Sequence, residues 1–340
     1  MQLEDIKGIT VLGTGTMGHG IALLCALAGY QVRLFGRSDA SLERGFSQIR
    51  SGLELLARNG LVDDFRIEGV MENIKGVTTL AEAAAGADFV IEAVVENLAV
   101  KQGLFQELDA LAPPHAILAS TTSGLDPTEL AALTRRPERV IVTHFWNPPH
   151  LLPLVEIVRG EKTSDATVEL ARALVIRLGR KPIKVKKAVP GFVGNRLQLA
   201  LLREALYIVE QGWATPEDVD AAVKYGFGRR LAVTGPLESA DLGGLDVFYS
   251  IQSYLNQDLC HERGPSQLLK EKVERGELGI KTGRGFYDWQ DERVAAVKKA
   301  REEDLIKRMK EDLGFIPAFP AKAAAAYMAE AARAGERPGR

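Results

Sequence analysis

The chain has 340 residues, which is enough for two domains and a sizeable hydrophobic core. Its formal net charge of -2, with both signs interspersed, gives no basis for a nucleic acid or an anionic membrane as partner. The two cysteines, Cys25 and Cys260, have no CxxC or metal-ligand spacing, so we predict buried thiols, no disulfide and no metal site. No apolar run reaches ~18 residues and the first residues resemble neither a signal nor a transit peptide. We therefore predict a soluble cytoplasmic protein.

A glycine-rich turn follows the first apolar run, residues 9–12. Helical spacing of apolar residues continues beyond it until Gly29. Glycines between a strand and a helix permit a tight turn and bring free helix amides close to a pyrophosphate. We predict a dinucleotide-binding turn made of Gly13, Gly15, Thr16, Met17 and Gly18.

The second strand, predicted for residues 31–35, does not end in the acid that usually binds the adenosine ribose. The chain reads Gly36-Arg37-Ser38 there. A missing acid beside an arginine is one way to accommodate the 2′-phosphate of NADP. Alternatively, Arg37 stacks on the adenine and the site binds NAD. The residues leave both cofactors open, with Gly36 and Arg37 as contacts.

Strand-like and helical segments alternate over the first 187 residues, which indicates a doubly wound, mostly parallel Rossmann-type sheet. Ligands bind beyond the carboxyl ends of such strands. Glu96, residues 120–123 and His144 all follow apolar runs, so we expect one cleft to collect them.

His144 closes one apolar run, residues 140–145, and Glu156 lies in the next, residues 154–158. If these runs are neighbouring strands, Glu156 contacts His144, holds the imidazole in one tautomer and stabilises its protonated form. The pair is therefore a candidate general base. A histidine that simply packs at the end of a buried strand is the alternative.

Beyond residue 187 the pattern becomes helical, with one short strand predicted at residues 285–287. We expect a long helix from Phe192 to Glu210, a helix opened by Pro216 after the cap Thr215, and another opened by Pro236. The predicted domains are residues 1–187 (dinucleotide binding), 188–290 (helical, substrate and dimerisation) and 291–340 (a helical extension with amphipathic segments near 294–309 and 321–332). The apolar content of the helical domain predicts a homodimer.

An ordered series of motifs resembles the L-3-hydroxyacyl-CoA dehydrogenase superfamily, including its lambda-crystallin and L-gulonate dehydrogenase branch. The motifs lie at residues 13–18, 92–97 with Lys101, 120–123, 144–148, 154–156, 190–196, 235–238 and 279–287. This resemblance implies hydride transfer between C3 of an L-3-hydroxyacyl-CoA and a nicotinamide cofactor, giving the 3-oxoacyl-CoA.

The resemblance also implies residue roles. His144 would remove the hydroxyl proton, Glu156 would orient His144, and Ser123 and Asn195 would hold the substrate oxygen. The implied cofactor contacts are Glu96, Lys101, Ser123, Asn147 and Lys281. Structural alternatives exist for four of them: Glu96, Ser123 and Asn195 could cap helices, and Asn147 could be a turn residue before Pro148.

Several positions depart from the family pattern. Gly36 replaces the ribose acid, Thr121 stands where fatty-acid members usually have Asn, and Trp146 replaces a Phe. Residues 55–60 lack the lysines that family members place near the CoA phosphates, although Arg58, or less readily Arg66, could substitute. The substrate therefore stays open between an acyl-CoA and a free 3-hydroxy acid of the L-gulonate or L-carnitine type. A crystallin-like protein that binds cofactor with little activity is a third hypothesis.

Overall fold

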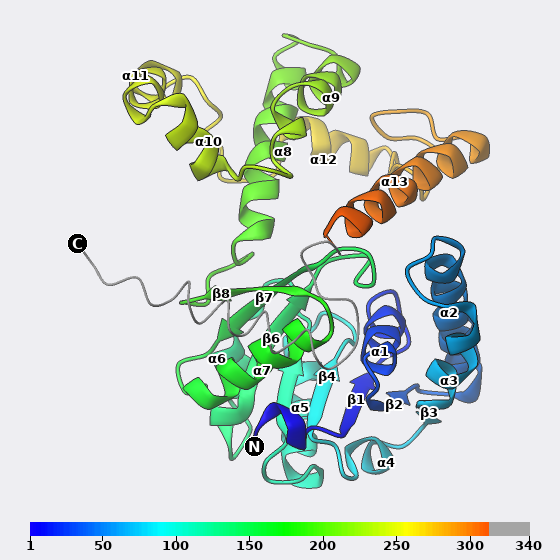
Figure 1. Cartoon of the computed structure of the whole chain (residues 1–340). Helices are drawn as coiled ribbons and strands as arrows, with labels where there is room; N and C mark the ends of the chain where they lie inside the picture. The colour runs from blue at the N-terminus through cyan, green and yellow to red at the C-terminus, as the bar shows by residue number, and fades with distance from the viewer. Residues whose placement is uncertain (313–340) are drawn as a thin grey trace. The chain divides into compact units, whose positions relative to one another are not determined.

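The computed structural model describes residues 1–312. These residues divide into two compact units. Unit 1 comprises Met1–Val193 together with the described residues from Arg301 onward, and unit 2 comprises Gly194–Ala300. Figure 1 labels most of the helices and strands of both units.

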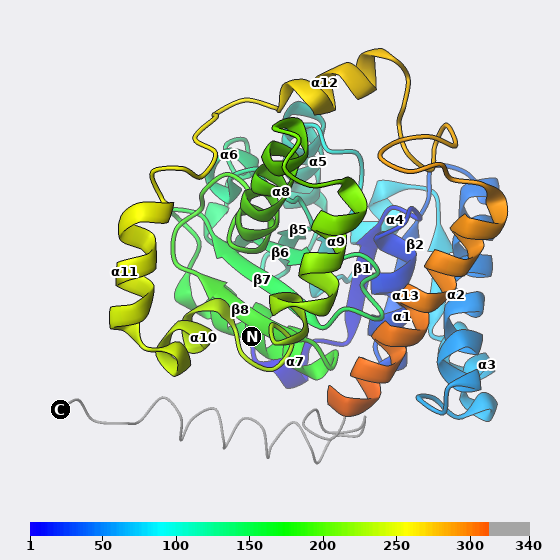
Figure 2. The ribbon, with the colours of Figure 1, turned by 90° about the horizontal axis from the view of Figure 1, so that it is seen from above.

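Unit 1 is built on one eight-stranded sheet with the order β3-β2-β1-β4-β5-β6-β7-β8. Neighbouring strands are parallel except for β6 and β7, which are antiparallel. This is the predicted doubly wound Rossmann-type sheet, and the reversal of strand order between β1 and β4 is its switch point. Figure 2 shows strands of the sheet from β8 to β2. The strands are β1 (Gly8–Leu12), β2 (Gln31–Phe35), β3 (Ile74–Val77), β4 (Phe89–Glu92), β5 (Ile117–Ser120), β6 (Val140–Phe145), β7 (Leu154–Arg159) and β8 (Lys181–Val185).

Two layers of helices cover the sheet, one on each face. Strand residues alternate between the two faces, so each face contributes apolar side chains to its own buried cluster. One buried cluster joins Ile9 and Val11 of β1 to helices α1, α2, α3 and α7, and includes Ile306 from the C-terminal segment. The other joins Val90 and Leu118 to α4, α5 and α6. The helices of unit 1 are α1 (Gly18–Leu27), α2 (Asp39–Arg58), α3 (Ile67–Glu72), α4 (Leu80–Ala84), α5 (Leu98–Leu111), α6 (Pro127–Leu130) and α7 (Asp165–Arg177).

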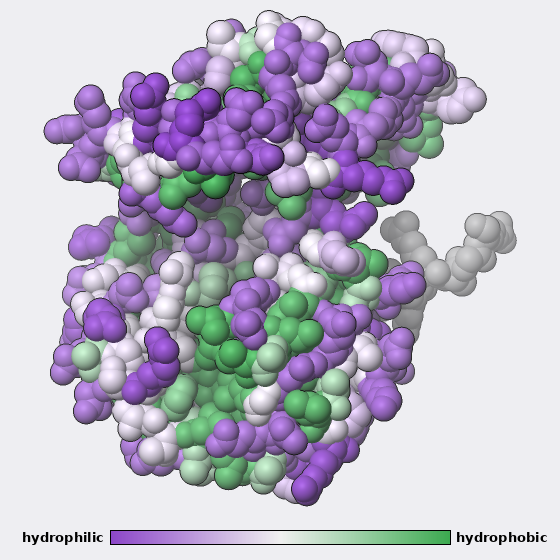
Figure 3. Space-filling view, turned by 180° about the vertical axis from the view of Figure 1, so that it is seen from behind, coloured by the Kyte–Doolittle hydropathy of each residue, from purple (hydrophilic) through white to green (hydrophobic). Residues whose placement is uncertain are grey.

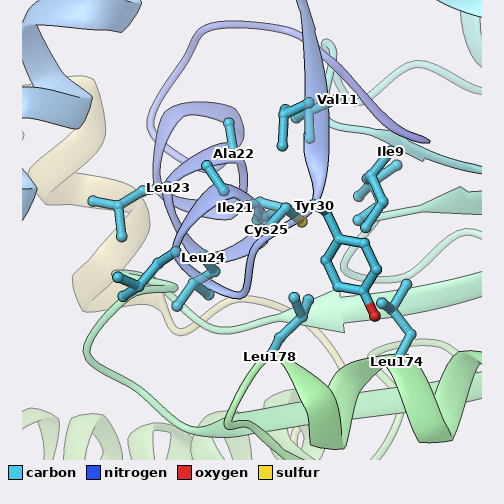
Figure 4. Close-up of a cluster of buried hydrophobic side chains, with 14 of the residues drawn as sticks. Ile9, Val11, Ile21, Ala22, Leu23, Leu24, Cys25, Tyr30, Leu174 and Leu178 are labelled. Carbon is cyan, nitrogen blue, oxygen red and sulfur yellow. The ribbon is translucent and has the colours of Figure 1, made fainter. Parts of the chain in front are cut away.

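Figure 4 shows the centre of the first cluster. Cys25 lies there, fully buried, and burial raises the pKa of its thiol far above the usual range. Tyr30 extends from the loop after α1 toward Leu174 and Leu178, and burial raises its pKa to about 12. Both titratable side chains are neutral at physiological pH and serve as packing groups.

Unit 2 contains helices and no strand of the sheet. Its helices are α8 (Gly194–Glu210), α9 (Pro216–Tyr225), α10 (Pro236–Gly243), α11 (Leu245–Leu255) and α12 (Gln267–Glu274), and α13 (Asp291–Asp312) continues from unit 2 into unit 1. Four short 3₁₀ helices span Leu3–Asp5, Asp64–Arg66, Pro137–Arg139 and Phe227–Arg229.

Several predicted boundaries were wrong. The helix expected after Pro236 is two helices, because Gly244 adopts a φ of 91° that L-residues avoid. Residues 285–287 form no strand; single bridges join Arg284 to Gly279 and Asp288 instead. The long helix begins at Gly194, and Phe192 before it has a φ of 48°. Strand β3 was not predicted, and the amphipathic segment near 321–332 lies outside the described residues.

Polar and charged side chains predominate on the face drawn in Figure 3, with hydrophobic residues gathered between them. Within residues 1–312, no helix combines the length and apolarity needed to cross a membrane.

A buried basic pair supports the loop that joins β6 to β7. Arg180 donates from Nη1 to the carbonyl oxygens of Pro149 and His150, each at 3.4 Å. Burial lowers the pKa of Arg180 to about 10, which leaves it charged at neutral pH. The Nδ1 atom of His150 has no hydrogen-bond partner among the described residues. Burial, with added repulsion from His19 and Arg180, lowers the pKa of His150 to about 4.

We predict that His150 makes folding acid-sensitive below pH 6.5. The unfolded state takes up a proton near pH 6.5 and the folded state only near pH 4, so stability falls as the pH drops across this interval. The full loss is about 3 kcal/mol. Urea unfolding at several pH values should show a shallower acid dependence for His150→Gln than for wild type. The exposed His261, changed to Gln, is the control; equal slopes in all three proteins would contradict the prediction.

Candidate active site

The turn after β1 has the geometry of a dinucleotide cradle. Gly13 adopts a φ of 114°, and a Cβ there would lie 2.6 Å from the Ala93 carbonyl oxygen. At Gly18 a Cβ would lie 1.9 Å from the Gly13 carbonyl oxygen, so helix and turn are in direct contact. Gly15 has no atom within 4 Å of its Cβ position and is exposed. The three glycines thus divide into two that the fold requires and one that faces open space, where a pyrophosphate would approach the backbone. The residues present fit a dinucleotide.

The end of β2 leaves little room for an acid. A Cβ at the buried Gly36 would lie 2.6 Å from Ser41 Oγ and 2.9 Å from Leu42 Cγ. Ser41 is held in place because it and Ser38 cap the start of α2 reciprocally. The next residue, Arg37, is exposed and has no hydrogen bond or ion pair among the described residues. A cation therefore lies one residue beyond the position at which the usual site has an acid.

A buried ion pair lies at the carboxyl ends of β4 and β5. Glu92, fully buried at the end of β4, accepts from Lys101 Nζ at 2.6 Å and from the Val94 amide at 2.6 Å. Its other oxygen accepts from Ser120 Oγ at 2.5 Å, across the β4–β5 register. Lys101 is only 1% exposed and also contacts Glu96 at 3.3 Å. The ammonium is thus engaged by two carboxylates, and the chain's own groups satisfy its charge.

Glu96 joins this cluster to the loop after β5. It accepts hydrogen bonds from the Thr122 hydroxyl and from the Ser123 amide, the latter at 3.1 Å. Neither Glu96 nor Ser123 caps a helix: Asn97 caps α5 and Asp126 caps α6. The capping alternatives were therefore wrong for both residues. The side chain of Glu96 is 47% exposed, so it remains accessible to a ligand.

His144 and Glu156 are directly opposite each other on the antiparallel strands β6 and β7. Opposite residues on antiparallel strands project from the same face, and the His144 Nδ1 atom lies 2.7 Å from Glu156 Oε2. His144 is 7% exposed and Glu156 is fully buried. Because Nδ1 is engaged by the carboxylate, Nε2 is the ring nitrogen left for a substrate.

Three further groups surround this pair. The Val193 amide donates to Glu156 Oε1 at 2.9 Å, and Trp146 Nε1 donates to Glu156 Oε2 at 3.3 Å. The Phe192 ring centroid lies 5.8 Å from that of His144, and the Trp146 ring lies 5.7 Å away. Aromatic rings and N–H donors thus enclose the imidazole and the carboxylate.

The remaining predicted residues divide between the units. Asn147 is exposed in the loop after β6, and its bond to Pro148 is cis. Asn195, the second residue of α8, and the exposed Lys281 belong to unit 2. The carboxyl edge of the sheet in unit 1 therefore brings together the glycine turn, the end of β2, Glu96, Lys101, Ser123 and the His144–Glu156 pair.

Some of the groups that build this edge were not predicted from the sequence. Glu92 carries a signal, since it is the only charged residue in the strand Phe-Val-Ile-Glu of β4. Phe192 and the Val193 amide carry none, because an aromatic contact or a backbone donation depends on how the chain turns after β8.

Family models match nearly the whole described chain. The NAD binding domain of 3-hydroxyacyl-CoA dehydrogenase matches residues 8–188, and the C-terminal domain of the same family matches residues 191–289. The chain belongs to the 3-hydroxyacyl-CoA dehydrogenase family. It is a dehydrogenase of this type, and its first domain is of the NAD-binding kind.

Individual relatives are named for different substrates. The "Probable 3-hydroxybutyryl-CoA dehydrogenase" of Bacillus subtilis is 42% identical over 288 residues, or 84% of this chain and 99% of that one. The 5-formyl-3-hydroxy-2-methylpyridine 4-carboxylate 5-dehydrogenase of Mesorhizobium japonicum is 38% identical over 301 residues, or 88% of this chain and 96% of that one. A crystal structure of an enzyme of the latter name, described as an NAD+-dependent dismutase, has a TM-score of 0.83 and 36% identity over 90% of this chain and 98% of that one.

We predict that Ala substitutions at Gly15 and Gly18 have different effects, the first on cofactor binding and the second on stability. Gly15→Ala should leave stability within about 0.5 kcal/mol of wild type and weaken cofactor binding roughly tenfold or more, because the methyl group occupies the phosphate position. Gly18→Ala should lower stability by roughly 2–4 kcal/mol through its clash with Gly13.

Urea unfolding and titration of NADH and NADPH fluorescence measure the two effects. Gly103→Ala is the matched control, because its Cβ position within α5 has no neighbour within 4 Å. If Gly15→Ala bound both cofactors as tightly as wild type does, the cradle would be misplaced.

Proposed function

We propose that this protein oxidises L-3-hydroxyacyl-CoA at C3 to the 3-oxoacyl-CoA, and reduces it in the reverse direction, with a nicotinamide cofactor. The observation that supports this most directly is the His144–Glu156 hydrogen bond of 2.7 Å at the carboxyl edge of the sheet. Family membership supplies the reaction class, and the geometry supplies a base that is oriented, largely buried and open at Nε2.

His144 takes the proton of the substrate hydroxyl at Nε2 as the hydride leaves C3. The nicotinamide supplies the acceptor for that hydride. Glu156 stabilises the positive charge that forms on the imidazole, and its own negative charge is already compensated by N–H donors. Ser123 and Asn195 hold the substrate oxygen as it becomes a carbonyl. Burial of the pair excludes water from the proton transfer.

The cofactor contacts are proposed residue by residue. Backbone from Gly13 to Gly18, which includes the exposed Thr16 and the partly buried Met17, would receive the pyrophosphate. Glu96, Ser123 and Asn147 contribute from the strand ends, and Lys281 from unit 2. Lys101 acts mainly by holding Glu96 and Glu92, because its ammonium is buried between them.

A substrate without CoA is the second candidate. The Mesorhizobium japonicum relative is named for an aromatic pyridine carboxylate, and it shares 38% identity with this chain. Residues 55–60 offer only the exposed Arg58 to a CoA phosphate. The aromatic Trp146 next to the base would suit a flat substrate. Free hydroxy acids of the gulonate or carnitine type belong to the same alternative.

The subunit arrangement is also a proposal. Large apolar side chains are exposed in unit 2, among them Tyr225, Val233, Leu237, Leu242 and Tyr249. Burial of such a surface between two copies would give a homodimer.

We expect His144→Gln to lower kcat at least roughly a thousandfold, with acetoacetyl-CoA as oxidant, while NADH affinity changes little. Gln retains the polarity of the side chain but cannot accept and release a proton. Activity that survived the substitution would remove His144 from the mechanism.

The same assay decides the substrate. Turnover of reduced cofactor should be compared with acetoacetyl-CoA, free acetoacetate and a 5-formylpyridine carboxylate. Preference for the thioester supports the first candidate, and turnover of only the free acids supports the second. Cofactor binding with no turnover of any of them would support a crystallin-like binding protein.

We propose that the end of β2 accepts the 2′-phosphate of NADP(H) in addition to NAD(H). Gly36 leaves no room for the usual acid, and Arg37 has no partner among the described residues. We expect Arg37→Ala to weaken NADPH binding about tenfold or more, which corresponds to one charge-assisted hydrogen bond, and NADH binding far less. Fluorescence titration measures both constants. Equal losses for the two cofactors would show instead that Arg37 stacks on the adenine.

A further inference from the structure

The indole of Trp146 shares an acceptor with the catalytic histidine. Its Nε1–H donates to Glu156 Oε2 at 3.3 Å, and this is the oxygen that lies 2.7 Å from His144 Nδ1. The other oxygen, Oε1, accepts from the Val193 amide at 2.9 Å. A Phe at this position would have no N–H to donate to Oε2.

We propose that Trp146 is a positioning residue that sets the pH range in which His144 works as a base. A carboxylate stabilises a neighbouring imidazolium through its negative charge. An N–H donor on the same oxygen draws charge away from the His144 contact and lowers the proton affinity of the pair as a whole. The indole thus keeps His144 unprotonated, and ready to accept a proton, to lower pH than a Phe at this position would.

The other groups around the pair do not replace this effect. Strand β8 places the apolar Ile183 opposite Glu156, and the Phe192 ring packs against His144. Two charged side chains on the packed strands pair elsewhere: Lys184 of β8 with Glu169, and Arg159 of β7 with Asp165. Lys181 lies at the start of β8, opposite Leu154 rather than Glu156. Along the sheet edge, β5 separates the pair from the cluster formed by Glu92, Glu96 and Lys101 on the β4 side.

The inference rests on the proposed role of His144, so one measurement must be independent of turnover. Imidazole nitrogen NMR of the ¹⁵N-histidine enzyme, without cofactor or substrate, follows the titration of His144, which His144→Gln identifies among the five histidines. In Trp146→Phe the midpoint of the His144 titration should rise by about half a pH unit or more. A shift of this size corresponds to a fraction of the free energy that a hydrogen bond to a charged group contributes. The acid limb of the kcat/KM profile should move in the same direction by a similar amount.

Two comparisons separate the hydrogen bond from packing. Trp213→Phe removes an indole N–H in unit 2, where Trp213 packs on Tyr207, and should leave the His144 midpoint unchanged. In the Glu156→Gln background, which lacks the charge, Trp146→Phe should have no further effect on that midpoint. If Trp146→Phe fails to fold, benzothienylalanine at position 146 keeps the bicyclic shape and replaces the N–H by sulfur.

The outcomes are distinct. An unchanged or lowered midpoint in the variants without the N–H would overturn the role of Trp146. A raised midpoint with an unchanged kcat/KM profile would retain the electrostatic coupling but contradict His144 as the base, and with it both the proposed mechanism and the proposal for Trp146 in catalysis.

Discussion

The candidate site depends on the hydrogen bonds that the carboxylate of Glu156 accepts. Glu156 is fully buried on β7, and an isolated charge in such a place would be strongly disfavoured. Donors from two segments compensate it: His144 and Trp146 at the end of β6, and the Val193 amide after β8. Because the two segments are far apart in the sequence, the charge also links the end of β6 to the chain after β8. Orientation of the base and local folding therefore have the same physical cause.

A second buried carboxylate, Glu92 on β4, is also compensated by donors from other parts of the chain. Glu92, Lys101 and Ser120 form a buried polar group at the ends of β4 and β5, and its hydrogen bonds extend through Glu96 into the loop after β5. These internal bonds connect the ends of β4 and β5 to the loop after β5 through the chain's own groups. Groups that stay accessible to a ligand include the open turn at Gly15, the half-exposed Glu96 and the exposed Arg37.

Much of this could be predicted because it follows from patterns along the chain. Strand and helix alternation gave the doubly wound sheet, and the glycine turn and the His144–Glu156 contact followed from strand order. The contacts of Trp146, Phe192 and Val193 could not be predicted, since each depends on a local turn after a strand has ended. Packing adds to one interpretation. The sequence shows only that Gly36 replaces an acid, whereas the structure shows that Ser41 and Leu42 fill the space that an acidic side chain would need.

The geometry also explains how one family acts on substrates as different as an acyl-CoA and a pyridine carboxylate. In the proposed mechanism the His144–Glu156 pair would contact only the oxygen that gains or loses a proton, and the hydride would concern only the neighbouring carbon. These two steps do not require the enzyme to recognise the rest of the substrate. Discrimination must therefore come from groups outside the pair, such as Arg58 at the end of α2 for a CoA phosphate or the indole of Trp146 for a flat ring. Trp146 is the residue where the two functions coincide, because it contacts the carboxylate through its N–H and presents its ring beside the base.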